Sequence, residues 1–302
     1  MATSTYILCP GQGAQAVGMG KDFAEKSAVA KDTFDTANRV LGFDLASVCF
    51  NGPDERLNQT DVSQPAIYVA SVASFRAARD AGKLDPAAVT AYAGLSLGEY
   101  TALHLAGVFG FEDGLRLVAA RGRYMQEAAV ASPSGMVAIL GAPKEAVVQL
   151  CEQVARGEVM VPANYNAPGQ IVVSGSRAAC ERVLQAAEAG GFKATALKVA
   201  GAFHSPLMQP AADRMRAELE RVSFRPPQKP VYSNVTAHPH RDAASIKQLL
   251  VEQIVSPVHW EDTMVKLVGA GEARFVELAP GRTLAGLAKR INRRLPVESV
   301  EA

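Results

Sequence analysis

The 302-residue chain has a formal net charge of +1, with 48% hydrophobic and 20% charged residues. These values are typical of a globular protein that can bury one large core, or a core with an inserted subdomain. A net charge so near zero provides no long-range field for nucleic acid or an anionic membrane, so an anionic partner must be held by a local cluster of basic residues.

The first 130 residues alternate short apolar runs with helix-type patterns. We predict a strand at 6–9, helices near 21–41 and 62–80, a strand at 89–94, and helices near 97–107 and 112–129. Strands separated by helices indicate a mostly parallel sheet that is covered on both faces. The fold class is therefore predicted to be α/β.

The pattern changes after Pro133. Strands predicted at 136–141, 158–164, 170–175 and 193–199 combine with helices at 142–156 and 177–190 in the order β-α-β-β-α-β. This is the order of a ferredoxin-like module. We therefore predict a ferredoxin-like subdomain at 132–199, inserted between the two parts, 1–131 and 200–302, of a larger α/β domain.

The second part of the larger domain returns to α/β character. Strands are predicted at 230–234 and 274–278. Between them, the polar, turn-rich stretch 236–242 is expected to form an exposed loop.

The segment Gly94-Leu95-Ser96-Leu97-Gly98 joins the predicted strand at 89–94 to the next helix. A G-x-S-x-G motif in this position is typical of a nucleophile elbow, with the serine on a sharp turn at a helix N-terminus. The glycines permit a tight turn, and backbone N–H groups there can stabilise a developing oxyanion. A plain turn is the alternative. We interpret Ser96 as the candidate nucleophile.

A serine nucleophile needs a base, for which histidine is the usual residue near neutral pH. Of the five histidines, His104 lies about 12 Å along the helix from the serine, and His238 and His240 fall in the polar loop, where we expect them to be solvated. His204 follows a predicted strand in a segment of small residues, and we favour it over His259. His204 has no acidic neighbour in sequence, so a backbone carbonyl is a candidate partner for its imidazole.

Arg121 lies on the same helical face as Leu117 and Met125. A guanidinium on an otherwise apolar stripe needs an anionic partner. That partner is either an internal carboxylate or the substrate, and the sequence pattern leaves both alternatives open.

The loop after the first strand contains Gly11-x-Gly13-x-x-Ala16, which also fits a dinucleotide-binding fingerprint. That fingerprint requires a second strand ending in an acidic residue about twenty positions later, whereas 21–41 is predicted to be helical. We therefore interpret the loop as backbone that packs against Ser96 and supplies an oxyanion N–H.

Four cysteines are scattered through the chain without C-x-x-C or metal-type spacing: Cys9, Cys49, Cys151 and Cys180. They indicate free thiols in a reducing compartment and no metal site. The N-terminus lacks the basic region and the long apolar core of a signal peptide. We expect a cytoplasmic protein, or a plastid protein if a transit peptide has been removed.

Six motifs resemble those of the malonyl-CoA:acyl carrier protein transacylases of fatty acid synthesis, in the family's order and over nearly the whole chain. The motifs are Pro10-Gly11-Gln12-Gly13-Ala14-Gln15, Gly94-Leu95-Ser96-Leu97-Gly98-Glu99-Tyr100, Arg121-Gly122-Arg123-Tyr124-Met125-Gln126, Asn164-Tyr165-Asn166-Ala167-Pro168-Gly169-Gln170, Phe203-His204-Ser205 and Ser256-Pro257-Val258-His259-Trp260.

The resemblance implies an α/β-hydrolase-like large domain with a ferredoxin-like insertion, and transfer of malonyl from malonyl-CoA to the phosphopantetheine thiol of acyl carrier protein. It implies ping-pong kinetics, no cofactor or metal, and a monomer that binds neither nucleic acid nor membrane. The implied site residues are Ser96 as nucleophile, His204 as base, the N–H groups of Gln12 and Leu97 as oxyanion hole, the carbonyl of Gln253 as orienting group, and Arg121, Phe203 and Asn166 as substrate contacts. Phe203 would limit the room at the α-carbon of the acyl group.

Leu95 and Ser256 depart from many bacterial members of this family, which carry histidine and asparagine there, and resemble the plastid-type pattern. Acyltransferases of polyketide assembly or malonate decarboxylation would share the same motifs. A serine thioesterase and a non-catalytic carrier-binding module are further alternatives, although a hydrolase of neutral esters has no use for Arg121. A basic cluster near the C-terminus is either a docking surface for an acidic carrier or a solvated helix face: Arg282, Lys289, Arg290, Arg293 and Arg294.

Overall fold

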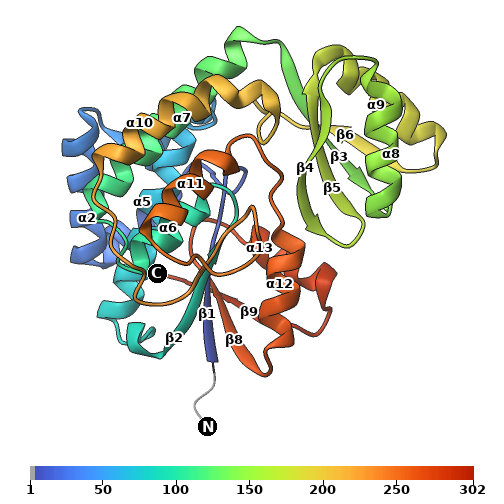
Figure 1. Cartoon of the computed structure of the whole chain (residues 1–302). Coiled ribbons are helices and arrows are strands. Elements are labelled where there is room, and N and C mark those ends of the chain that lie inside the picture. Colours follow the sequence, from blue (N-terminus) through green and yellow to red (C-terminus); the bar gives the residue numbers. More distant parts are fainter. Residues whose placement is uncertain (1–3) are drawn as a thin grey trace.

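The computed structural model describes residues 4–302, so residues 1–3 of the predicted 1–131 segment lie outside the described part. The strands form two separate sheets, which Figure 1 shows side by side. One sheet has five strands in the order β7-β2-β1-β8-β9, and the other has four in the order β4-β5-β3-β6. The predicted α/β fold class, with a smaller second sheet, is confirmed.

All neighbouring strands of the five-stranded sheet are parallel. Their bounds are β1 Ser4–Cys9, β2 Val89–Gly94, β7 Val231–Tyr232, β8 Ala273–Glu277 and β9 Val297–Ser299. In β1, the consecutive residues Ile7, Leu8 and Cys9 are completely buried. Such a continuous apolar run is expected for a parallel strand that is covered on both faces.

Helices surround this sheet (Figure 1). They are α1 Lys21–Lys26, α2 Ala28–Leu41, α3 Leu45–Asn51, α4 Asp54–Leu57, α5 Thr60–Asp80, α6 Gly98–Leu105, α7 Phe111–Ala131, α10 Gln209–Arg221, α11 Ala243–Gln253, α12 Trp260–Gly269 and α13 Thr283–Ile291. The prediction of one helix at 21–41 is wrong: Ser27 is extended, and its hydroxyl accepts the N–H of Ala30 to begin a second helix.

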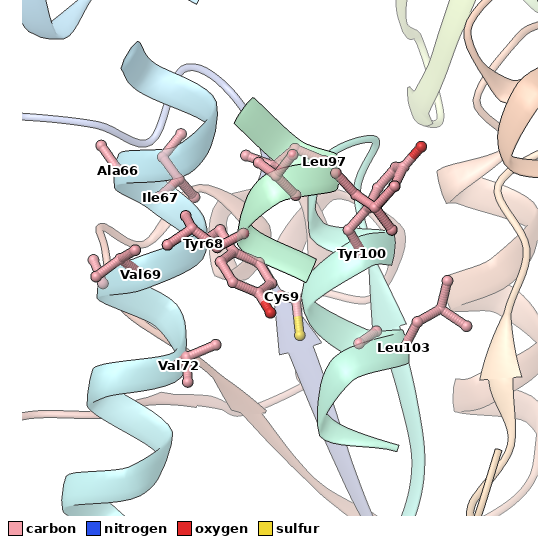
Figure 2. Packing of buried hydrophobic residues seen from close by; sticks show 14 of the residues in the cluster. Cys9, Ala66, Ile67, Tyr68, Val69, Val72, Leu97, Tyr100 and Leu103 are labelled. Atoms are coloured by element: carbon pink, nitrogen blue, oxygen red, sulfur yellow. The ribbon is translucent and has the colours of Figure 1, made fainter. Parts of the chain in front are cut away.

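Helix α5 is the central element of the large core, and its residues from Val62 to Phe75 are buried. Figure 2 shows Ile67 and Tyr68 of α5 facing Leu97 and the side chains of α6, with Cys9 of β1 close by. The helix that follows the serine motif is therefore fixed on one side by α5 and on the other by the sheet.

The four-stranded sheet is antiparallel and lies within the predicted 132–199 segment. It consists of β3 Ser134–Leu140, β4 Met160–Ala167, β5 Gln170–Ser176 and β6 Lys193–Ala196, with helices α8 Lys144–Ala155 and α9 Arg177–Ala189. The β-α-β-β-α-β order is confirmed, although β6 ends three residues earlier than the predicted strand. A core of its own, including Val137, Ile171 and Val183, packs beneath the two helices.

Candidate active site

Ser96 lies between the end of β2 at Gly94 and the start of α6 at Gly98, with a φ of 53°. This left-handed conformation is uncommon for a residue other than glycine and marks a sharp turn. Packing also requires glycine at two positions: a Cβ on Gly98 of the turn would lie 2.1 Å from the Cys9 carbonyl oxygen, and one on Gly11 of the N-terminal loop would lie 2.3 Å from the Leu95 carbonyl oxygen. The N-terminal loop and the turn are therefore in direct backbone contact.

His204 meets the serine from a segment 108 residues further along the chain. Its Nε2 lies 2.8 Å from Ser96 Oγ, and its Nδ1 lies 2.7 Å from the carbonyl oxygen of Gln253. A carbonyl can only accept, so Nδ1 carries the proton and Nε2 is free to accept one. Burial, and then the charge of Arg121, lowers the pKa of His204 to about 4. The imidazole is thus neutral at pH 7 and able to act as a base.

The other histidines have different surroundings. His259 stacks on Tyr165 with ring centroids 5.3 Å apart, and its Nδ1 lies 3.2 Å from Asp262. His104 is partly buried beside the large core, and its Nδ1 lies 3.1 Å from the carbonyl oxygen of Phe109. The prediction that His240 is solvated is wrong, because it is only 7% exposed and its Nε2 lies 2.7 Å from Glu99 Oε1.

Arg121 extends from α7 to the serine and is 1% exposed. Its NH2 donates to Ser96 Oγ at 3.0 Å and to Gln253 Oε1 at 2.9 Å, and its NH1 donates to Gln64 Oε1 at 2.7 Å. All three acceptors are neutral, and within residues 4–302 the guanidinium forms no direct ion pair. The alternative of an internal salt bridge is therefore wrong for direct contacts. A buried cation lies next to the serine hydroxyl.

Two backbone amides near the serine are also without partners. The N–H groups of Gln12 and Leu97 donate no hydrogen bond to any of residues 4–302. Gln12 belongs to the loop after β1, and the chain between β1 and β2 is helical. The second strand that a dinucleotide fingerprint requires is thus missing from residues 10–88, which excludes that alternative.

A cavity of about 320 Å³ opens beside the serine. Two groups of residues line the cavity. The first lies outside the antiparallel sheet and includes Gln12, Ser96, Arg121, Phe203 and His204. The second lies on the strands of that sheet and includes Met136, Asn164, Asn166 and Val172. The side-chain oxygen of Asn166 is buried and has no partner among the described residues. Lys198 also lines this cavity, whereas the basic C-terminal cluster does not. The predicted site residues Gln12, Ser96, Arg121, Asn166, Phe203 and His204 therefore share one cavity.

The sequence does not predict the residues that hydrogen-bond to the backbone of the serine turn. Asn234, the last residue of the strand predicted at 230–234, donates from Nδ2 to the Gly94 carbonyl oxygen at 2.7 Å, and its Oδ1 accepts the N–H of Ser96. The available signal was a polar residue at the carboxyl end of a parallel strand. The position of Asn234 points to the serine turn only because β7 lies beside β2, and the sequence does not reveal that pairing.

The buried histidines predict how stability depends on pH. The pKa of His204 and that of His104 are both lowered by burial from 6.5 to about 4. The unfolded chain therefore binds more protons between pH 6.5 and 4, and stability is lost as the pH falls through this range. Each histidine is expected to cost about 3 kcal/mol by pH 4. Denaturant titrations from pH 7 to 4 would measure this, with a smaller decline in His204→Gln and an unchanged one in His238→Gln, whose side chain is exposed. Equal declines in all three proteins would contradict the assignment.

Across residues 4–302, no group of three His, Cys, Asp or Glu side chains is arranged to hold a metal ion. In the same part of the chain, no helix is both long enough and apolar enough to cross a membrane. All four cysteines are free and buried.

Comparisons with known proteins show that the chain is similar to acyltransferases over nearly its whole length. A family model described as "Acyl transferase domain" matches residues 5–300. The malonyl CoA-acyl carrier protein transacylase of Salmonella typhimurium is 42% identical over 290 residues, which are 96% of this chain and 93% of the relative. The structure of the Coxiella burnetii enzyme of the same name superimposes with a TM-score of 0.96 at 38% identity, covering 99% of this chain and 94% of that one.

One solved relative was captured with a partner. A malonyl-transacylase in complex with a type II polyketide synthase acyl-carrier protein has a TM-score of 0.94 and 40% identity, covering 99% of this chain and 96% of the other. The match of the family model over residues 5–300, with relatives this similar along nearly the full length, leads to one conclusion. The chain belongs to the acyl transferase domain family.

Proposed function

We propose that this protein transfers a malonyl group from malonyl-CoA to the phosphopantetheine thiol of an acyl carrier protein, through a malonyl ester on Ser96. One observation carries the proposal: the serine hydroxyl lies 2.8 Å from a neutral histidine and 3.0 Å from a buried guanidinium. The histidine accounts for acyl transfer, and the guanidinium accounts for an acyl group that bears a free carboxylate.

In the first half-reaction, Ser96 Oγ attacks the thioester carbonyl while His204 Nε2 accepts the hydroxyl proton. The N–H groups of Gln12 and Leu97 stabilise the oxyanion in this proposal, which is supported by their having no acceptor among residues 4–302. When the C–S bond breaks, His204 returns the proton to the departing coenzyme A thiolate. The Gln253 carbonyl holds the imidazole orientation and supports its transient positive charge.

In the second half-reaction, the same residues act on a different nucleophile. His204 accepts the proton of the carrier's phosphopantetheine thiol, the sulfur attacks the malonyl ester, and the proton then returns to Ser96 Oγ. The first product leaves before the second substrate enters, so the kinetics are ping-pong.

Substrate selection is proposed to rest on three residues that line the cavity. Arg121 binds the malonyl carboxylate through two N–H groups. Phe203 restricts space near the α-carbon, so a methyl branch would cost about 1–3 kcal/mol. Asn166 lines the cavity and is proposed to contact the polar part of the thioester substrate.

The proposed pathway is fatty acid synthesis, in which the transacylases that the six motifs resemble act. The polyketide complex supports a second candidate, a carrier protein of polyketide assembly. The shared chemistry explains why both are compatible with one site. We infer a reducing compartment such as the cytoplasm, because all four cysteines of the described structure are free thiols.

Intact-protein mass spectrometry tests the proposal. Brief mixing with malonyl-CoA should add one malonyl group, and holo acyl carrier protein should then remove that group and acquire it. An adduct that is lost to water at the same rate with and without the carrier would indicate a hydrolase. If malonyl-CoA forms no adduct at all, Ser96 is not the nucleophile.

A further inference from the structure

The carboxylate of Glu99 is completely buried behind the serine turn, in the first turn of α6. It accepts three hydrogen bonds. Oε2 accepts the N–H of Asn234 at 3.0 Å and Nε2 of Gln253 at 2.7 Å, and Oε1 lies 2.7 Å from His240 Nε2. A carboxyl group surrounded by donors is ionised, because the charged form accepts every one of these bonds.

His240 does not neutralise this charge. Its side chain is fully buried, and its Nδ1 has no partner among residues 4–302. A doubly protonated ring would therefore leave a buried N–H without an acceptor, which is costlier than an unused lone pair. The imidazole is neutral, with its single proton on Nε2 directed at Glu99. The counter-charge of the carboxylate has to come from another residue.

Gln253 connects Glu99 to a cation. Its side-chain NH2 donates to Glu99, while its side-chain oxygen accepts the NH2 of Arg121 at 2.9 Å. One amide thus has an anion at its nitrogen end and a cation at its oxygen end, the orientation that aligns its dipole with both charges. Burial lowers the pKa of Arg121, and nearby Tyr100 and Glu99 oppose that lowering.

We propose that Glu99 is the buried counter-charge of Arg121, acting through the side-chain amide of Gln253, and that it positions the guanidinium in the acyl-free enzyme. Glu99 is in this sense a positioning residue, since no substrate atom touches it. The cluster is neutral before substrate binds and becomes singly negative when a malonyl carboxylate reaches Arg121. The last statement rests on the proposed function, whereas the pairing of Glu99 with Arg121 does not.

A double-mutant cycle in thermal stability tests the pairing without any substrate. Glu99→Gln keeps the shape and removes the charge. In the Arg121 protein it leaves a buried cation uncompensated and should lower Tm by about 5–10 °C. In an Arg121→Gln background the same substitution removes an uncompensated anion and should leave Tm unchanged or raise it. A fall of equal size in both backgrounds would overturn the proposal.

The chain offers a matched control in Glu277, a second fully buried carboxylate, which accepts the N–H groups of Leu284 and Ala285 and contacts no residue of the site. Glu277→Gln should lower Tm equally with and without Arg121. If Glu99→Gln alone fails to fold, the double variant decides: recovery of folded protein supports the pairing, and failure of both overturns it.

A final readout links the pairing to the reaction. In Glu99→Gln, malonylation of Ser96 supplies an anion to Arg121 and should recover part of the lost Tm, whereas acetylation should not. A merely structural role for Glu99 predicts no difference between the two acyl groups. Glu99→Gln could lower Tm only when Arg121 is present while the malonyl and acetyl adducts behave alike. The pairing would then stand, and the proposed contact between Arg121 and the malonyl carboxylate would fail.

Discussion

Replacing Ser96 by alanine is expected to lower malonyl transfer by at least about 10⁴-fold, because in the proposed mechanism its hydroxyl carries the covalent intermediate. The hydroxyl contacts both the base and the guanidinium, at 2.8 and 3.0 Å. Without it, His204 has no proton to accept and the malonyl group has no place of attachment. Stopped assays that follow malonyl transfer to a carrier protein, together with the intact mass after malonyl-CoA, measure this directly.

Ser71→Ala provides the matched control. Ser71 is a buried serine on α5 whose hydroxyl donates to the Ala279 carbonyl oxygen, in the core and not in the site. Its loss should change stability and leave transfer within a few fold of the unaltered protein. A malonyl adduct on the Ser96→Ala protein would show that another residue is the nucleophile, and the mechanism above would have to be abandoned.

The elbow could be predicted from sequence because its determinants are local. Gly94 and Gly98 frame the serine, an apolar strand precedes it and a helix follows it, and all of this lies within about fifteen residues. The antiparallel module was also predictable, since its order of elements follows from the alternation of short apolar runs. Both features depend on patterns that repeat over a few residues, and the structure confirms them as folded elements.

The network behind the elbow could not be predicted in the same way. Asn234 and His240 meet Glu99 across 135 and 141 residues, and Gln253 meets it across 154. Nothing in the neighbouring sequence of His240 distinguishes it from the exposed His238, so the sequence predicts a solvated loop for both. Their difference is set by which side of that loop packs against α6, which is a property of the tertiary structure.

The partner of Arg121 shows the same limit. The helical pattern around Leu117 and Met125 correctly placed the guanidinium in the interior, but it could not choose between a carboxylate and a substrate. The structure shows an arrangement that differs from both alternatives. Arg121 contacts only neutral acceptors, and the nearest anion of the cluster, Glu99, is reached through an amide. A direct salt bridge would have neutralised the positive charge of Arg121, which is the charge that a substrate carboxylate would bind.

This arrangement makes Arg121→Ala the second substitution with a large expected effect. Transfer of malonyl should fall by about 10²–10³-fold in kcat/KM, the usual result of removing one partner of a buried charged hydrogen-bonded pair. Transfer of acetyl, which has no carboxylate, should be unchanged or increase, because alanine leaves space in the cavity. The malonyl-to-acetyl ratio of kcat/KM, measured with both coenzyme A thioesters, is the informative quantity.

The ratio separates selectivity from damage to the site. Arg121 also donates to Ser96 Oγ, so its removal can slow both substrates through the nucleophile, and only the carboxylate contact changes one relative to the other. Arg76→Ala is the control: this half-buried arginine of the same core donates to Thr33 and lies over the Phe111 ring, so its loss should reduce stability and leave the ratio unchanged. An unchanged ratio in Arg121→Ala would mean that the guanidinium orients the serine and does not read the acyl group. The buried cation next to Ser96 would then be part of the catalytic scaffold alone.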